Sequence, residues 1–315
     1  MLALLLILFA FGMHGYAQPR AEFPNSANAI DWSSAGVGGI PARTTLCASL
    51  TPSATLARIN AALASCRGGE TVYLTAGTYS IPETVRIPSN VTLRGAGANL
   101  TILNATGRGG GDVISLGSGS VPYRPMRIIG GAKTGSTSIE LQSGAGVRAG
   151  TYLAIAETNN PAYVSAAGSG GNCNWCDGWT KDGSLARGQI VKVTGVSGSV
   201  IAISPGLLSA YTNAPIAVPF DMAESYAGVE DLQVYANNTG YASNFGMSAC
   251  AYCWIKGVES NYADGDHVEV YWGFHDEIRD SYFSNAFLHR PGRYDSDIQI
   301  AFKTSDSLIE NNIIV

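Results

Sequence analysis

The stretch Tyr79–Leu103, YSIPETVRIPSNVTLRGAGANLTIL, decides the fold of this chain. It holds short runs of branched apolar residues, and each run is stopped by Pro, Asn or Gly before a helix can form. The apolar positions are too sparse for a hydrophobic helix, and no Asn-Gly turn folds one run back on the next. The pattern predicts many short strands that bend at glycines and asparagines.

The composition of the whole chain agrees with a turn-rich β protein. Of its 315 residues, 38 are Gly and only 14% are charged, which argues against a coiled coil, a collagen or a disordered chain. The formal net charge is −5, and the sequence has no basic patch or basic tail. Nucleic acid is therefore not expected as a partner.

The N-terminus has the pattern of an export signal. Its apolar stretch from Leu2 to Met13 is too short to span a bilayer comfortably. Gly15 and Ala17 are small residues that suit a signal peptidase, so we expect a signal peptide over residues 1–17. No Lys or Arg precedes the apolar run, which an N-terminally clipped gene model would explain, and an uncleaved anchor stays open as the alternative. We expect a secreted or periplasmic protein, with no membrane segment after cleavage.

The six cysteines suit an exported chain, in which an even number indicates disulfides. Cys47 and Cys66 flank a candidate helix, and the other four form two C-x-x-C pairs, CNWC from Cys173 and CAYC from Cys250. The two pairs lie much farther apart than the ligand pairs of a zinc ribbon. We expect local or mutual disulfides, with a structural metal as the alternative.

The chain divides into segments of different pattern. The third of them alternates apolar and polar positions over several strands, which indicates an inserted β subdomain with a half-exposed sheet or a small barrel. The segments are residues 1–17, the signal peptide; 18–123, a polar arm, a cap helix and the first coils; 124–220, the inserted subdomain; and 221–315, further coils.

A single convincing helix precedes the strands, in LTPSATLARINAALASC, where we expect Thr51 as N-cap and an apolar face of Leu56, Ile59 and Leu63. From Val72 the sequence reads VYLTAGTYSIPETVRIPSNVTLRGAGANLTIL. A helix followed by this pattern resembles the opening of a right-handed parallel β-helix of the pectate-lyase-like superfamily. The resemblance implies an all-β fold, a right-handed parallel β-helix with an N-terminal cap helix, to which the alternating pattern adds the inserted small β subdomain.

A repeated motif after residue 225 supports stacked coils. Its first position is a branched apolar residue that we expect to point inward: Val229, Ile255, Ile278 and Ile309. Its third position is expected to form a polar ladder at a turn, since neighbouring coils lie about 4.8 Å apart: Asp231, Gly257, Asp280 and Asn311. Because the chain ends within a strand at Val315, we expect further coils beyond it.

Each repeat also holds an upstream strand, in NFGMSAC, DHVEVYW and SDIQIAF. Strand alternation places Val268 beside Ile298 inside the coil. On each of the two strands, the residues directly before and after these positions then point outward. On this register His267 lies beside Asp297, as a base with its orienting carboxylate, and Glu269 lies diagonal to Asp297 as a carboxylate pair. His267, Glu269 and Asp297 are therefore the expected catalytic residues.

Residues around these three are expected to bind the sugar. Arginines suit bidentate binding of a uronate carboxylate, and loop aspartates are weak candidates for calcium, the one cofactor that the sequence raises. The expected substrate-binding residues are Tyr271, His289, Arg290, Arg293 and Lys303. The calcium candidates are Asp264, Asp266 and Asp295.

The resemblance implies that this exported protein is polysaccharide-active, because the outward face of this sheet often forms the sugar groove in the superfamily. A lyase would use His267 as base with Arg290 or Arg293 as cation, whereas a glycoside hydrolase would use Glu269 and Asp297. An acidic polysaccharide is the expected substrate. ADGDHVEV is faintly similar to a polygalacturonase strand, but the paired Asp-Asp, Gly-His-Gly and Arg-Ile-Lys motifs are missing, so the resemblance assigns no catalytic residue.

Two other functions stay open. A non-catalytic β-helix, either a glycan-binding or an adhesin-type surface protein, is the main alternative. A phage-like tail fibre is disfavoured by the signal-like N-terminus.

Overall fold

The computed structural model describes residues 32–107, 110–161, 164, 171–173, 177–236, 239–286 and 297–315. Every described strand and helix belongs to one compact unit, Ala35–Val315. Within the described ranges, no helix has the length and apolar character that a membrane crossing needs.

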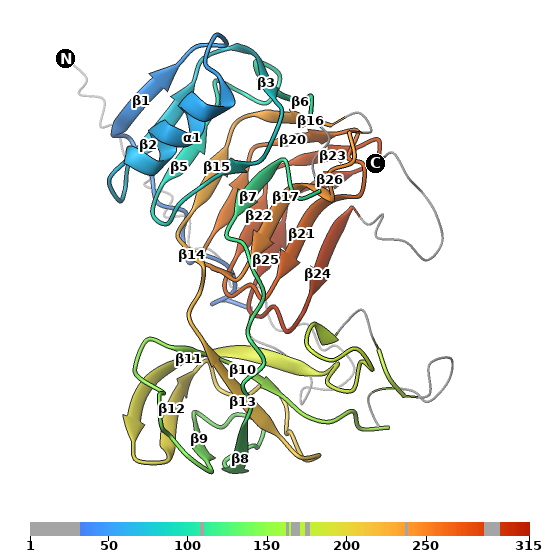
Figure 1. Cartoon of the computed structure of the whole chain (residues 1–315). Helices are drawn as coiled ribbons and strands as arrows, with labels where there is room; N and C mark the ends of the chain where they lie inside the picture. Colours follow the sequence, from blue (N-terminus) through green and yellow to red (C-terminus); the bar gives the residue numbers. More distant parts are fainter. Residues whose placement is uncertain are drawn as a thin grey trace, which may run out of the picture. The chain divides into compact units, whose positions relative to one another are not determined.

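Three parallel sheets form the coils (Figure 1). The first sheet holds β1 (Leu46–Leu50), β2 (Thr71–Leu74), β5 (Thr92–Arg94), β15 (Gly228–Glu230), β19 (Trp254–Lys256), β22 (Glu277–Arg279) and β25 (Leu308–Glu310). The second holds β3 (Gly77–Ile81), β6 (Thr101–Ala105), β16 (Gln233–Tyr235), β20 (Glu259–Asn261), β23 (Tyr282–Ser284) and β26 (Ile313–Ile314). The third holds β4 (Val85–Arg86), β7 (Ile114–Leu116), β17 (Ser243–Ser248), β21 (Asp266–Tyr271) and β24 (Ile298–Ala301). A short parallel pair, β14 (Glu224–Ser225) with β18 (Cys250–Ala251), lies at one corner, and together these sheets make the expected parallel β-helix.

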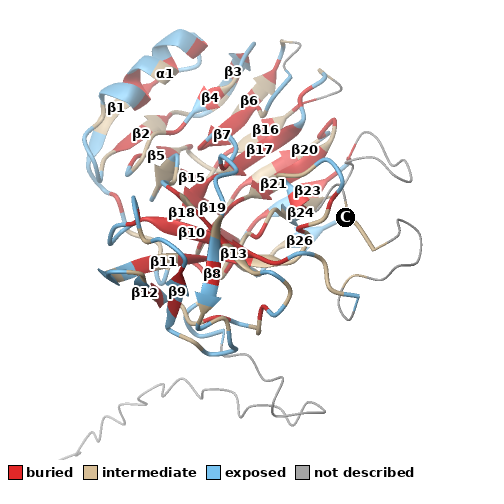
Figure 2. Ribbon diagram, turned by 60° about the horizontal axis from the view of Figure 1, so that its bottom comes forward, coloured by how far each residue is buried: buried red, intermediate tan, exposed pale blue. Residues whose placement is uncertain are grey.

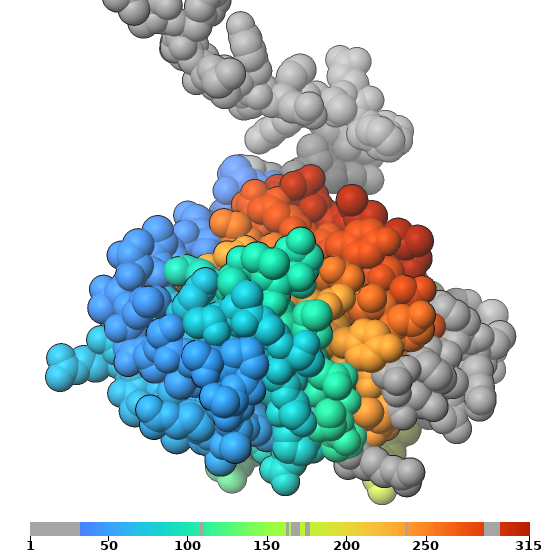
Figure 3. Space-filling view, turned by 90° about the horizontal axis from the view of Figure 1, so that it is seen from above, coloured from blue at the N-terminus to red at the C-terminus, as the bar shows by residue number. Residues whose placement is uncertain are grey.

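The cap helix α1 (Leu56–Ser65) packs on the first coils, at the end of the stack that Figure 3 shows in blue. Its apolar face of Leu56, Ile59 and Leu63 is buried, as expected. The expected N-cap Thr51 is wrong, because Thr55 accepts the hydrogen bond from the Arg58 backbone N–H. Residues 51–54 form a separate turn before the helix, in which Ala54 N donates to Thr51 O at 2.8 Å.

The repeated motif stacks as expected in successive coils. Val229, Ile255 and Ile278 pair in register and are at most 2% exposed, whereas Ile309 in the last coil of the structure is 43% exposed. The third positions all have a left-handed backbone, with φ between 53° and 63°, so they form a turn. Within this ladder Asn311 Nδ2 donates to Asp280 Oδ1 at 2.6 Å.

An antiparallel closed barrel interrupts the coils between β7 and β14, which confirms the inserted β subdomain. It has its own apolar core, and Figure 2 shows buried residues on its strands as well as on the coils. Because β15 pairs directly with β5, the insertion leaves the stacking of the coils intact. The barrel strands are β8 (Met126–Gly130), β9 (Ser138–Leu141), β10 (Tyr152–Ala156), β11 (Gly188–Ser197), β12 (Val200–Ser204) and β13 (Ile216–Phe220).

The cysteines that the structure describes form disulfides. One joins Cys47 on β1 to Cys66 at the end of α1, and another joins Cys250 to Cys253 within one turn. Cys173 is also disulfide-bonded, while Cys176 lies outside the described residues. The local disulfide is thus confirmed for the CAYC pair, and a metal shared by the two C-x-x-C pairs is not supported.

Candidate functional site

A row of side chains crosses the outer face of the third sheet, β4–β7–β17–β21–β24, which is called the site face below. The register pairs Arg86 with Ser115, Ser115 with Gly246, Gly246 with Glu269, and Glu269 with Gln299. The flanking residues of β21, Val268 and Val270, have no exposed surface and belong to the core. Because side chains alternate along a strand, the row points away from that core.

The Asp112 carboxylate lies over Gly246. A Cβ atom on Gly246 would meet Asp112 Oδ2 at 1.8 Å, so only a glycine leaves space for the carboxylate there. Asp112 precedes β7, and its Oδ1 accepts a hydrogen bond from Ser243 Oγ at 2.7 Å. Since Glu269 is the next residue of the row after Gly246, one strand spacing of about 4.8 Å separates the two positions. The fold thus brings two carboxyl groups from distant parts of the sequence to one place.

Burial raises the pKa of Glu269 above its usual range, and the charge of Asp112 raises it further, whereas contacts with Asp266 and Tyr271 lower it. Burial also raises the pKa of Asp112, against the lowering effect of the hydrogen bond from Ser243. Both side chains are only half-buried, so solvent reaches them. A carboxyl group that keeps its proton beside a carboxylate is the pairing that acid–base cleavage of a glycosidic bond uses.

Tyr271 and Gln299 extend the site beyond Glu269. The Tyr271 hydroxyl donates to Gln299 Oε1 at 2.5 Å, and its ring packs on Phe302 with 4.5 Å between ring centroids. Tyr271 is half-buried and lies on the site face, as expected. Its sugar-binding role stays a prediction.

The expected outward direction of His267 is wrong. The side chain has no exposed surface, its Nδ1 lies 2.7 Å from Ser260 Oγ on β20, and its ring centroid lies 5.9 Å from that of Phe283. Asn244, in the preceding coil, takes the same inward direction and donates to Ser260 Oγ at 2.8 Å. Regular alternation therefore begins only after this corner of the coil. A buried imidazole cannot remove a proton from a polysaccharide, so the lyase arrangement with His267 as base loses its support.

The register behind that prediction is nevertheless confirmed. Val268 pairs with Ile298, and Glu269 with Gln299. His267 Nε2 lies 3.9 Å from Asp297 Oδ1, and the Asp297 side chain is 42% exposed. The histidine is thus a buried neighbour of an accessible carboxylate, and a catalytic role of Asp297 stays a prediction.

Lys303 does not lie where a substrate-binding residue would. It is buried, its Nζ donates to the backbone oxygen of Asp177, and it lies 4.4 Å from the ring centroid of Trp179. Desolvation lowers the pKa of Lys303 to about 8. Phe302 and Lys303 both have positive φ, so the chain turns sharply after β24 and places the lysine against the barrel segment instead of on the site face.

The calcium candidates do not converge among the described residues. Asp264 Oδ2 accepts from the backbone N–H of Gly240 and of Tyr241, so it closes a loop. Asp266 is fully buried and contacts Glu269. Neither aspartate belongs to a described cluster of three Cys, His or acidic ligands. The remaining loop candidates lie outside the described residues: His289, Arg290, Arg293 and Asp295.

Asp112 is a site residue that sequence reasoning missed. The register aligns DVIS from Asp112 with SNFG from Ser243 and DHVE from Asp266. The same strand pattern is therefore present in GDVISL of an early coil. Extending the comparison of the repeats across the inserted barrel would have found it.

Residues 54–134 match a protein family described as "Rhamnogalacturonase A/epimerase, pectate lyase-like". No curated protein sequence matches the chain. The tailspike of Pseudomonas phage phi297 is 15% identical, with a TM-score of 0.55, over 82% of this chain and 44% of that one. The tailspike of Pseudomonas phage LKA1 is 19% identical, with a TM-score of 0.54, over 72% of this chain and 35% of that one. The chain thus spans less than half the length of either tailspike, and at these identities the likeness shows the fold alone.

Proposed function

Because the chain is a parallel β-helix protein of the pectate-lyase-like superfamily, we propose that it is exported and acts on a polysaccharide at the site face. The family description names a rhamnogalacturonase and an epimerase, which supports a polysaccharide substrate. The disulfides and the signal-like N-terminus support export. The single observation that carries the site assignment is the Asp112 carboxylate seated over Gly246, next to Glu269.

The reaction that this geometry favours is glycoside hydrolysis. Glu269 is the proton donor to the glycosidic oxygen, because burial and the neighbouring Asp112 charge both raise its pKa. Asp112 is the ionised partner, which activates water or attacks the sugar, and the hydrogen bond from Ser243 favours its charged form. Tyr271 and Gln299 lie beside this pair and contact the sugar ring.

The test compares Glu269→Gln and Asp112→Asn with the unchanged protein on polygalacturonate, rhamnogalacturonan and alginate. Glu140→Gln, an exposed change on the barrel, is the matched control. We expect release of reducing ends without unsaturated uronates, a loss of at least about a hundredfold in both site variants, and no loss in the control. Asp297→Asn in the same assay decides whether Asp297 is the partner of Glu269 instead.

Three results contradict the proposal in different ways. Unsaturated products would indicate a lyase. Binding of glycans without any product would indicate the non-catalytic surface. Full activity of Glu269→Gln and Asp112→Asn would place the chemistry elsewhere in the chain.

A further inference from the structure

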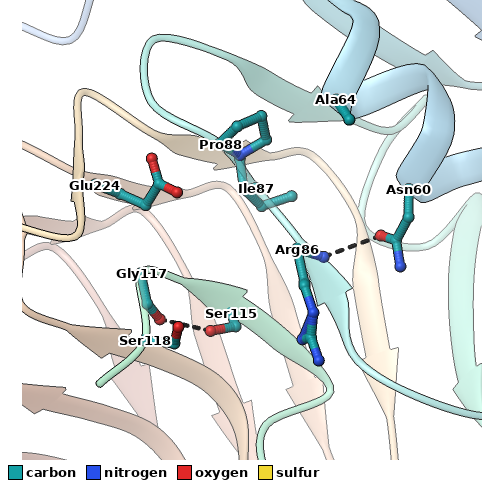
Figure 4. A pocket seen from close by; sticks show the side chains of 9 residues that line it. All are labelled: Asn60, Ala64, Arg86, Ile87, Pro88, Ser115, Gly117, Ser118 and Glu224. Carbon is teal, nitrogen blue, oxygen red and sulfur yellow. Dashed lines mark hydrogen bonds between the residues drawn. The ribbon is translucent and has the colours of Figure 1, made fainter. Parts of the chain in front are cut away.

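A surface pocket of about 270 Å³ lies where the row of the site face reaches the first coils (Figure 4). It is formed by residues of α1, of β4 with the loop after it, of β7 with the loop after it, and of β14. Its lining combines one cation, one carboxylate and apolar surface. The residues used in the argument are Asn60, Arg86, Ile87, Pro88 and Glu224.

Asn60 fixes the position of Arg86. From α1, its Oδ1 accepts from the Arg86 backbone N–H at 3.0 Å, and its Nδ2 donates to the Thr84 backbone oxygen at 3.1 Å. One amide therefore holds β4 against the helix on both sides of Val85. The Arg86 side chain itself is exposed, and it forms no ion pair with any described residue.

The other walls suit a sugar ring. Pro88, with the almost fully buried Ile87 beside it, gives the pocket an apolar surface, and binding pockets commonly combine such surface with a few fixed polar groups. Glu224 lies on the other side of these two residues from Arg86 (Figure 4). Its Oε2 accepts from Ser89 Oγ at 2.5 Å, so it is held in place. A fixed carboxylate accepts hydrogen bonds from hydroxyl groups.

The carboxyl groups of the site face are consistent with a cation, Arg86, that lies away from the proposed cleavage centre. Asp112, Asp266 and Glu269 gather carboxyl groups at the proposed cleavage centre, and the ionised Asp112 repels a uronate carboxylate placed directly beside it. Arg86 stands three strands away in the same row, about 14 Å at the usual strand spacing. An oligosaccharide that crosses the strands reaches both places, whereas a single sugar does not.

We propose that this pocket is a distal subsite for an acidic sugar residue, whose carboxylate pairs with the Arg86 guanidinium. A guanidinium binds a carboxylate through two parallel hydrogen bonds. A neutral sugar has no carboxylate and cannot accept this pair of bonds. The inference rests on the proposed function, because it assigns the substrate class of the same face. It places the selection for acidic polysaccharides at Arg86, away from the residues that break the bond.

The test measures binding by calorimetry in the Glu269→Gln background, which prevents turnover. The probes are oligosaccharides of polygalacturonate and of alginate, and the same oligosaccharides after reduction of their carboxyl groups. Arg86→Ala is compared with Arg86→Lys and with Arg58→Ala, a control that removes an exposed arginine of α1 outside the pocket lining.

We expect Arg86→Ala to raise the Kd for an acidic oligosaccharide about tenfold, the change for one lost charged contact. Arg86→Ala should not change the Kd for the carboxyl-reduced sugars. Arg58→Ala should not change the Kd for either kind of sugar, and Arg86→Lys should bind the acidic oligosaccharide more tightly than Arg86→Ala does. Equal loss on acidic and reduced sugars, no loss on either, or no binding of any acidic probe would overturn the subsite. Hydrolysis is judged separately, on the protein that keeps Glu269. If binding depends on Arg86 but the protein with Glu269 releases no product, the subsite stands and the proposed cleavage is refuted.

Discussion

Gly246→Ala is the sharpest perturbation of the site face, because the new methyl group occupies the place of a carboxylate. The Cβ atom would lie 1.8 Å from Asp112 Oδ2 and 2.1 Å from its Cγ. Gly246 does not need a glycine backbone, since its φ is not in the positive range. The substitution therefore moves the Asp112 side chain away from Glu269 while the strand β17 stays in place.

The change in the free energy of unfolding follows from the contacts that the Asp112 carboxylate loses and the repulsion that Glu269 is spared. Asp112 loses its hydrogen bond from Ser243, and a bond to a charged group contributes about 1.5–3 kcal/mol. Moving the Asp112 charge away from the partly solvated Glu269 relieves a repulsion and stabilises the fold by about 1 kcal/mol. We expect a net decrease in the free energy of unfolding of about 2 kcal/mol or less. The rate of cleavage should fall about a hundredfold or more, because one member of the acid–base pair is displaced.

The assay follows reducing-end release against pH, with urea unfolding in parallel. Without the Asp112 charge beside it, Glu269 has a pKa closer to its usual range, so the alkaline limb of the profile should move to lower pH. Gly111→Ala is the matched control, because its Cβ atom would have only Thr84 Oγ1 within reach, at 4.0 Å. If Gly246→Ala keeps a rate within about fivefold of the control, Asp112 is not a partner of Glu269.

Three further predictions concern stability. Burial raises the pKa of Asp276 well above its usual range, so above about pH 4 the folded chain keeps a proton that the unfolded chain has lost. The free energy of unfolding should then fall as pH rises, and urea titrations of Asp276→Asn should show a flatter decline. Lys303 has its pKa lowered from 10.5 to about 8, so between these values the unfolded chain binds more protons and stability should rise with pH. Thermal melts of Lys303→Met should lack that rise, and an unchanged rise would exclude Lys303 as its source. The Cys47–Cys66 disulfide spans 19 residues, and replacing both with serine should cost about 3 kcal/mol in urea unfolding, which an unaltered midpoint would contradict.

The repeat could be predicted from the sequence because its inward residues leave little choice of register. Val229, Ile255 and Ile278 are the central residues of equivalent strands, and only a parallel stack in phase buries all three. The same reasoning gave the pairing of Val268 with Ile298, which the structure confirms. Branched apolar residues that recur once per coil therefore carry most of the fold.

The site was harder to predict because its residues depend on breaks in that regularity. His267 follows the corner of a coil, where Asn244 also turns inward, so simple alternation gave it the wrong face. Lys303 lies within a left-handed turn that no apolar pattern marks. Asp112 is separated from Glu269 by the inserted barrel, and its neighbourhood depends on the missing side chain of Gly246. Such features become visible only once the coils are stacked.

The proposed acid and its partner belong to stretches of chain that are made at different times. Asp112 is synthesised before the barrel and Glu269 after it, yet the strands β7 and β21 both flank β17. Neither half of the molecule carries a complete reaction centre while the other half is still unfolded. Enzymatic turnover would thus report that both halves have folded onto β17, and a mutation that keeps the second half from folding would abolish activity without changing any residue that meets the sugar.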